Sequence, residues 1–169
     1  MPNHLKPRLF LLPIVTSVWL GSETLAGGSE TMRFATLNAS MGLAEEGQLL
    51  QRLRAGDDPN LRKLAEVVQR TRPDVLLLNE FDYQPGPEQA ELLARYLGRS
   101  EAGLEPVKFP YHYSAPVNTG VPSGLDIDGN GQTDDPGDAW GFGRFPGQYA
   151  MLVLSRFAID EEHARSFQH

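Results

Sequence analysis

Short apolar runs of strand length recur along the chain and predict its sheet. They occupy Arg33–Asn38, Val75–Leu78 and Tyr149–Ser155, and a shorter candidate lies at Tyr111–Ser114. Strands buried on both faces read as continuous apolar runs rather than as alternating ones. The run Val75–Leu78 is continuous in this sense, so we predict a central strand that is covered on both faces.

Segments of helical spacing lie between these runs. The clearest follows Asp58, a good N-cap residue, and ends near Thr71 because Pro73 forbids continuation. A weaker helix is predicted within Leu43–Arg54, and another covers Pro87–Leu97. The alternation of strand and helix favours an α/β domain. The apolar positions that define the clearest helix are Leu61, Leu64, Ala65 and Val68.

Composition narrows the class of protein. The chain has 169 residues, 40% of them hydrophobic, which suits one domain with a core of its own. It has no cysteine, so disulfides cannot stabilise it. A net charge of −7 argues against broad electrostatic binding of nucleic acid. It does not exclude a nuclease, because a divalent metal can act at the phosphate among acidic side chains.

The N-terminus is typical of a secretory leader. Lys6 and Arg8 precede the apolar stretch Leu9–Leu20, and Thr24–Ala26 offers small residues for cleavage. We predict a signal peptide over residues 1–26, a linker over 27–32 and the domain over 33–169. The apolar stretch is shorter than the roughly 20 residues of a membrane span. A secreted or periplasmic protein without stable membrane anchoring after cleavage is therefore expected; an uncleaved anchor is the alternative.

Two polar residues end the predicted strands. Asn38 closes the first strand and Glu80 follows the second. Open α/β sheets hold their ligands at the carboxyl ends of strands. Mg²⁺ typically takes one or two carboxylates together with waters and substrate phosphate. Asn38 and Glu80 are therefore candidate site residues, although capping of the turns that follow would also explain them.

The strand motifs resemble those of the endonuclease/exonuclease/phosphatase superfamily. Arg33–Asn38 is similar to its opening strand, Pro73–Glu80 to its metal-binding motif, and Gly147–Arg156 to a later strand. The resemblance implies a four-layer α/β sandwich and hydrolysis of phosphoesters with Mg²⁺ or Mn²⁺. It implies that Glu80 binds the metal and that Asn38, the active-site Asn, helps to hold metal and phosphate. The segments around residues 118–124 and 139–147 look like those of a secreted bacterial branch.

The chain also departs from the family pattern. Asn79 stands where Gln is usual, and Ser40 stands where some members have Asp. The later Asp-x-Asn and Ser-Asp-His motifs do not follow Ser155. We therefore expect about the first half of such a domain, inactive by itself. We also expect its last strand, Tyr149–Ser155, to expose hydrophobic surface.

A second constellation lies in the long Gly- and Pro-rich segment Glu105–Gly147, a length typical of functional or metal-ordered loops. Oxygen side chains at positions 1, 3, 5 and 9, with Gly at position 6, have the spacing of an EF-hand-type calcium loop. The usual Glu at position 12 is missing, and Asp138 stands one place later. We predict a structural Ca²⁺ loop over 126–138; a solvated acidic turn is the alternative. Its predicted ligands are Asp126, Asp128, Asn130, Gln132 through its backbone, and Asp134.

Aromatic residues flank this loop. We predict that they pack it onto the sheet and that Arg144 lies on the surface. His112, between two tyrosines, is assigned a structural role.

Two functions of different classes follow. The first is an exported metal-dependent phosphoester hydrolase, of nuclease or phosphatase type. Its substrate is nucleic acid, a phospholipid head group or a small phosphate ester. The alternative is a secreted, calcium-stabilised binding module without catalysis. The sequence leaves the substrate, the catalytic metal and the oligomeric state open.

Overall fold

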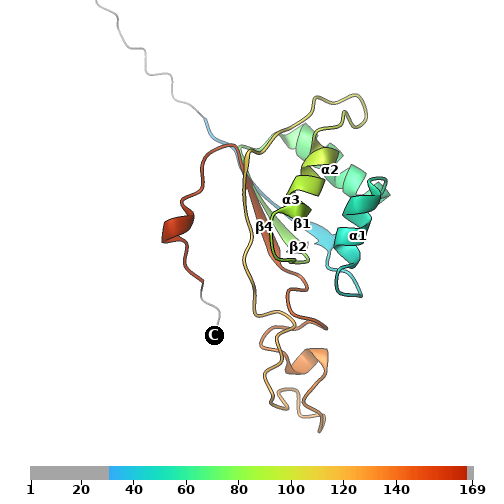
Figure 1. The fold of residues 1–169 in the computed structure, drawn as a ribbon, viewed down its shortest axis with the longest axis vertical. Helices are drawn as coiled ribbons and strands as arrows, with labels where there is room; N and C mark the ends of the chain where they lie inside the picture. The colour runs from blue at the N-terminus through green and yellow to red at the C-terminus, as the bar shows by residue number, and fades with distance from the viewer. Residues whose placement is uncertain (1–30, 167–169) are drawn as a thin grey trace, which may run out of the picture. The chain divides into compact units, whose positions relative to one another are not determined.

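The protein is described by a computed structural model, which covers residues 31–166 (Figure 1). The predicted signal peptide and most of the predicted linker lie outside the described residues. Within residues 31–166 the strands form one sheet in the order β1-β2-β4-β3. Strands β1 and β2 are parallel, whereas β4 is antiparallel to both β2 and β3. The strands are β1 Phe34–Met41, β2 Val75–Phe81, β3 Tyr111–Tyr113 and β4 Met151–Ser155.

Helices pack on one face of this sheet (Figure 1). They are α1 Gln48–Ala55, α2 Pro59–Thr71 and α3 Glu88–Leu97, and two short 3-10 turns lie at η1 Pro136–Asp138 and η2 Glu161–His163. The predicted limits of α2 are confirmed, because the Asp58 side chain accepts hydrogen bonds from the backbone N–H groups of Asn60 and Leu61. Helix α1 begins later than predicted, after the left-handed Gly47. Among the described residues, no helix is long and apolar enough to cross a membrane.

The prediction that the central strand is covered on both faces is wrong for the described residues. Leu76 and Leu78 are buried under the helices, whereas Val75 and Leu77 on the opposite face are only half-buried. We call that opposite side the open face. On it, Phe34 of β1 is 69% exposed and Met151 of β4 is 46% exposed. The expectation of exposed hydrophobic surface on the last strand is therefore confirmed.

A carboxylate fastens the strands at the end where β2 begins. Asp74 accepts a hydrogen bond from the backbone N–H of Arg33 at 2.8 Å and another from the Arg156 guanidinium at 2.7 Å. The Arg33 N–H is the main cause that lowers the pKa of Asp74, and Arg156 adds to it against the opposing effect of burial. Asp74 thus links residues at the start of β1 and the end of β4.

The hydrogen bonds of the Asp74 carboxylate predict that the stability of the protein depends on pH. A carboxyl group whose pKa is lower in the folded state adds stability above its unfolded pKa of about 3.9. That stability is lost as the pH falls through the folded pKa. We expect Asp74→Asn to have a lower free energy of unfolding than the wild type at pH 7. Its free energy of unfolding should also fall less steeply with decreasing pH, because up to one proton fewer is taken up on unfolding. Urea unfolding followed by circular dichroism from pH 7 to pH 3 measures both, with the exposed Asp57→Asn as control. If the free energy of unfolding varied with pH in the same way for the wild type and Asp74→Asn, the stabilising role of the Asp74 carboxylate would be contradicted.

Candidate functional site

The structure places Asn38 and Glu80 side by side in two neighbouring parallel strands, although β1 does not end at Asn38 as predicted but continues to Met41. In the β1–β2 ladder Asn38 pairs with Asn79, the residue directly before Glu80. Adjacent strands lie about 4.8 Å apart, so Asn38 and Glu80 are close neighbours at this edge. Asn79 donates a hydrogen bond to the Thr36 hydroxyl at 2.9 Å, which fixes the amide across the two strands.

Both strands change course at this point. Ser40 and Glu80 have φ values of 51°, in the left-handed region that residues other than Gly rarely adopt. The ladder resumes at Met41 and Phe81 after a register shift. Phe81 is buried, whereas Glu80 is only half-buried, so the turn removes Glu80 from the buried side of the strand. A left-handed backbone conformation at a residue other than Gly costs of order 1–3 kcal/mol, and such residues cluster at functional sites.

The two candidate side chains differ in their partners. Asn38 Oδ1 accepts a hydrogen bond from the Ser40 N–H at 2.8 Å, which shapes the turn and leaves the Asn38 amide N–H₂ as a donor. Asn38 therefore does serve the turn, as the capping interpretation predicts. Among residues 31–166, the Glu80 carboxylate makes no hydrogen bond and no ion pair, so it is available to a cation. Turn capping thus accounts for Asn38 but not for Glu80.

Sequence reasoning missed a group of buried polar side chains next to this site. Asp82 is 2% exposed and accepts hydrogen bonds from the backbone N–H groups of Leu43 at 2.8 Å and Tyr149 at 2.9 Å. Burial raises the pKa of Asp82, and these two N–H groups oppose that rise. Gln148, fully buried, donates to the Leu43 carbonyl and accepts from the Arg144 N–H. We call Asp82, Gln148 and Leu43 the strand-end bracket.

The bracket joins the loops that follow β1, follow β2 and precede β4. The Tyr149 ring also packs directly against Gly42, where a Cβ atom would clash with it. The signal available in the sequence was a carboxylate two residues after Glu80 and a Gln before an apolar strand. These residues position the strand ends that carry Asn38 and Glu80.

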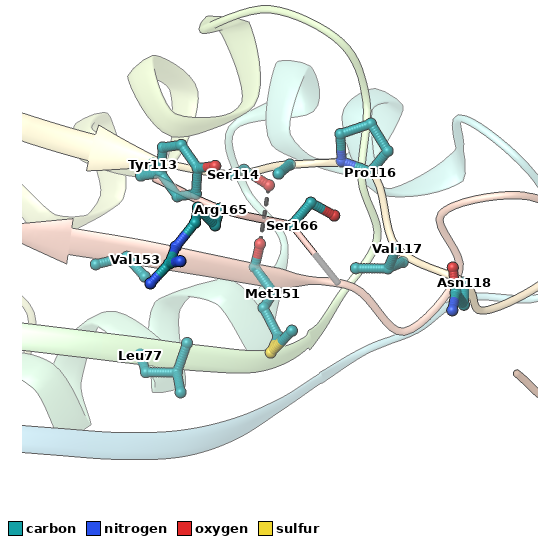
Figure 2. A pocket seen from close by; sticks show the side chains of 11 residues that line it. Leu77, Tyr113, Ser114, Pro116, Val117, Asn118, Met151, Val153, Arg165 and Ser166 are labelled. Atoms are coloured by element: carbon teal, nitrogen blue, oxygen red, sulfur yellow. Dashed lines mark hydrogen bonds between the residues drawn. The ribbon is translucent and has the colours of Figure 1, made fainter. Parts of the chain in front are cut away.

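A cleft of about 420 Å³ opens on the open face of the sheet (Figure 2). Its floor includes Leu77, Met151 and Val153, and Arg165 of the C-terminal segment lies over it. Leu77 lies on β2 three residues before Glu80, and Met151 pairs with Asn79, so the cleft begins beside the site. The lining is mainly apolar and carries no carboxylate, so this cleft offers no anionic ligand to a metal ion.

The predicted calcium loop is ordered around its first aspartate. Asp126 accepts hydrogen bonds from the backbone N–H groups of Gly129 at 2.7 Å, Asn130 at 3.0 Å and Gly131 at 3.0 Å. The structure brings Asp126 and Asp128 together with Asp138, each offering an oxygen within 4.8 Å of the others. The other predicted ligands lie around this cluster: Asn130 contacts Asp128 and accepts from the Gln132 N–H, while Asp134 lines a neighbouring pocket.

The aromatic residues after this loop do not hold it as predicted. Trp140 is 47% exposed and Phe142 is 64% exposed, and only Phe145 is buried. Backbone contacts hold the segment instead, because glycines allow close approach. Gly141 pairs with Thr119, and Gly120 packs on the backbone of Phe145.

Comparison with known proteins identifies the fold family. The family model described as "Endonuclease/Exonuclease/phosphatase family" matches residues 35–169. Comparison with curated proteins and with solved structures finds no match. The mixed α/β architecture agrees with this family. The chain therefore belongs to the endonuclease/exonuclease/phosphatase family.

Proposed function

We propose that this protein is an exported, divalent-metal-dependent phosphoester hydrolase that binds Mg²⁺ or Mn²⁺ through Glu80. Family membership supports phosphoester hydrolysis as the kind of reaction. The observation that carries the metal assignment is the Glu80 carboxylate, half-buried and held in a left-handed turn beside Asn38. The basic and apolar pattern of the leader supports export.

The residues at the strand ends suit binding and orientation. Glu80 provides one hard anionic ligand, which fits a cation that keeps several waters and takes substrate phosphate oxygens. A bound divalent cation supplies positive charge to a phosphoryl oxygen and thereby favours in-line attack by water. Asn38, whose Oδ1 is engaged by Ser40, would donate its amide N–H₂ to a phosphoryl oxygen. The strand-end bracket holds the loops that carry both groups.

A chelation assay tests this proposal. Because residues 1–169 by themselves are expected to be inactive, the assay uses a form of the protein that also carries the family's later Asp-x-Asn and Ser-Asp-His motifs. This protein is stripped with EDTA and assayed with bis(4-nitrophenyl) phosphate and 4-nitrophenyl phosphate, which distinguish diesterase from monoesterase activity. We expect hydrolysis to fall to the uncatalysed rate and to return with added Mg²⁺ or Mn²⁺. Activity that survives EDTA would refute the metal dependence. A protein inactive on both esters in every metal would favour the binding-module alternative.

A further inference from the structure

We propose that Asp126, Asp128 and Asp138 form a structural Ca²⁺ site in which Asp138, rather than Asp134, supplies the closing carboxylate. Asp138 is 1% exposed, and its Oδ1 accepts a hydrogen bond from the Ile127 N–H at 2.7 Å. Its Oδ2 is buried and has no hydrogen-bond partner among the described residues. A buried carboxylate oxygen without a partner is costly unless a cation meets it. The unpartnered Asp138 oxygen therefore points to a bound cation independently of the calcium-loop spacing in the sequence.

The cluster has the geometry and charge of a cation site. Calcium takes oxygen ligands at 2.3–2.6 Å, so two ligands across one ion lie about 4.6–5.2 Å apart. The oxygens of Asp126, Asp128 and Asp138 lie within 4.8 Å of one another, inside that limit. Among residues 31–166, none of these aspartates makes an ion pair with Lys, Arg or His. Three carboxylates this close repel each other strongly unless a cation neutralises them.

The ligand class favours Ca²⁺ over Mg²⁺. All the offered groups are hard oxygens, and the site is built on an irregular loop rather than on rigid strands. Mg²⁺ demands near-ideal octahedral geometry at about 2.0–2.1 Å and gives up its waters reluctantly, whereas Ca²⁺ accepts flexible coordination by 6–8 oxygens. Water and backbone carbonyls of the loop would complete the shell. A Cβ atom at Gly137 would lie 2.7 Å from Asp128 Oδ2, so a side chain there would displace this carboxylate from its present position.

The site fastens the long segment between β3 and β4. The Asp138 backbone carbonyl accepts a hydrogen bond from the Ser123 N–H at 3.1 Å, and its side chain accepts one from the Ile127 N–H. Asp138 therefore contacts both the segment before the loop and the loop itself. The next residue, Ala139, forms a bridge with Pro122. Farther on, the Gly147 N–H bonds to the Thr119 carbonyl directly before Gln148 of the strand-end bracket. Calcium would therefore stabilise the fold at this edge rather than take part in hydrolysis.

Thermal unfolding of the full chain with EDTA, 1 mM Ca²⁺ or 1 mM Mg²⁺ tests the site. A ligand at about 100 times its Kd raises the melting temperature of a domain of this size by roughly 5 °C or more. We expect such a rise with Ca²⁺ and a smaller one with Mg²⁺, and calorimetric titration should give a stoichiometry of one. A melting temperature that is the same in EDTA and in Ca²⁺ would overturn the proposal.

Matched variants locate the ligands. Asp138→Asn should lose the Ca²⁺-dependent rise, and so should Asp128→Asn, an exposed change that tests the site without disturbing a buried position. Asp134→Asn, in the same loop but outside the cluster, should keep it. Loss of the rise in Asp134→Asn with retention in Asp138→Asn would reverse the assignment.

Discussion

In a form of the protein that also carries the family's later Asp-x-Asn and Ser-Asp-His motifs, Glu80→Gln should lower the rate of metal-dependent phosphoester hydrolysis at least about a hundredfold. The substitution keeps the size of the side chain but removes the negative charge that the cation requires. Metal polarisation contributes several kcal/mol of transition-state stabilisation, and each 1.4 kcal/mol changes a rate about tenfold. The affinity for Mg²⁺ should fall by at least about tenfold, the lower limit known for groups that merely support a metal ligand. Steady-state kinetics against Mg²⁺ concentration measure both quantities.

The control for this change is Glu45→Gln, which removes an exposed carboxylate on the loop that follows β1. Glu45→Gln should leave hydrolysis and Mg²⁺ dependence unchanged, and both variants should unfold at wild-type denaturant concentrations. Because Glu80 makes no hydrogen bond or ion pair among the described residues, its replacement removes no contact there. Wild-type activity and Mg²⁺ dependence in a folded Glu80→Gln protein would show that the cation is held elsewhere.

Local signals in the sequence were sufficient to locate the helices and the central strands, and they were sufficient for the limits of α2. Asp58 and Pro59 define the start of α2, and Pro73 limits its end, because capping and proline geometry act within one helical turn. Strand β2 was recognisable from the apolar run Val75–Leu78, although it continues to Phe81. Its one-sided burial was not, because a continuous apolar run reports hydrophobicity and not which element covers each face.

The site was only partly accessible to sequence reasoning. Asn38 and Glu80 were found from their place at strand ends, but their juxtaposition depends on the parallel register of β1 and β2. The left-handed turn at Glu80 has no local sequence signal, since such turns usually use Gly. Asp138 was not among the predicted calcium ligands, because it lies one place beyond the last ligand position of an EF-hand loop. Only the folded chain shows that its carboxylate is buried and offers an oxygen within 4.8 Å of those of Asp126 and Asp128.

The second large effect is expected at the strand-end bracket. Asp82→Ala should lower the free energy of unfolding by about 3 kcal/mol, because it removes two charge-assisted hydrogen bonds and leaves the N–H groups of Leu43 and Tyr149 without their acceptors. Asp82→Asn should cost less, since its carbonyl oxygen can still accept from one of the two. Urea denaturation followed by fluorescence gives the values. The exposed loop residue Glu46, changed to Ala, should stay within about 0.5 kcal/mol of the wild type.

A double-mutant cycle with Gln148→Ala decides whether the bracket acts as a unit. Asp82 holds the Leu43 N–H and Gln148 holds the Leu43 carbonyl, so both side chains restrain the same residue. Once either is removed, the loop after β1 is free to rearrange, and the second removal should cost less than it does alone. We expect a coupling free energy of at least about 0.5 kcal/mol, as for residues that share a partner. Strict additivity would show that Asp82 and Gln148 act independently, and a loss below about 0.5 kcal/mol for Asp82→Ala would mean that the strand ends are held by packing alone.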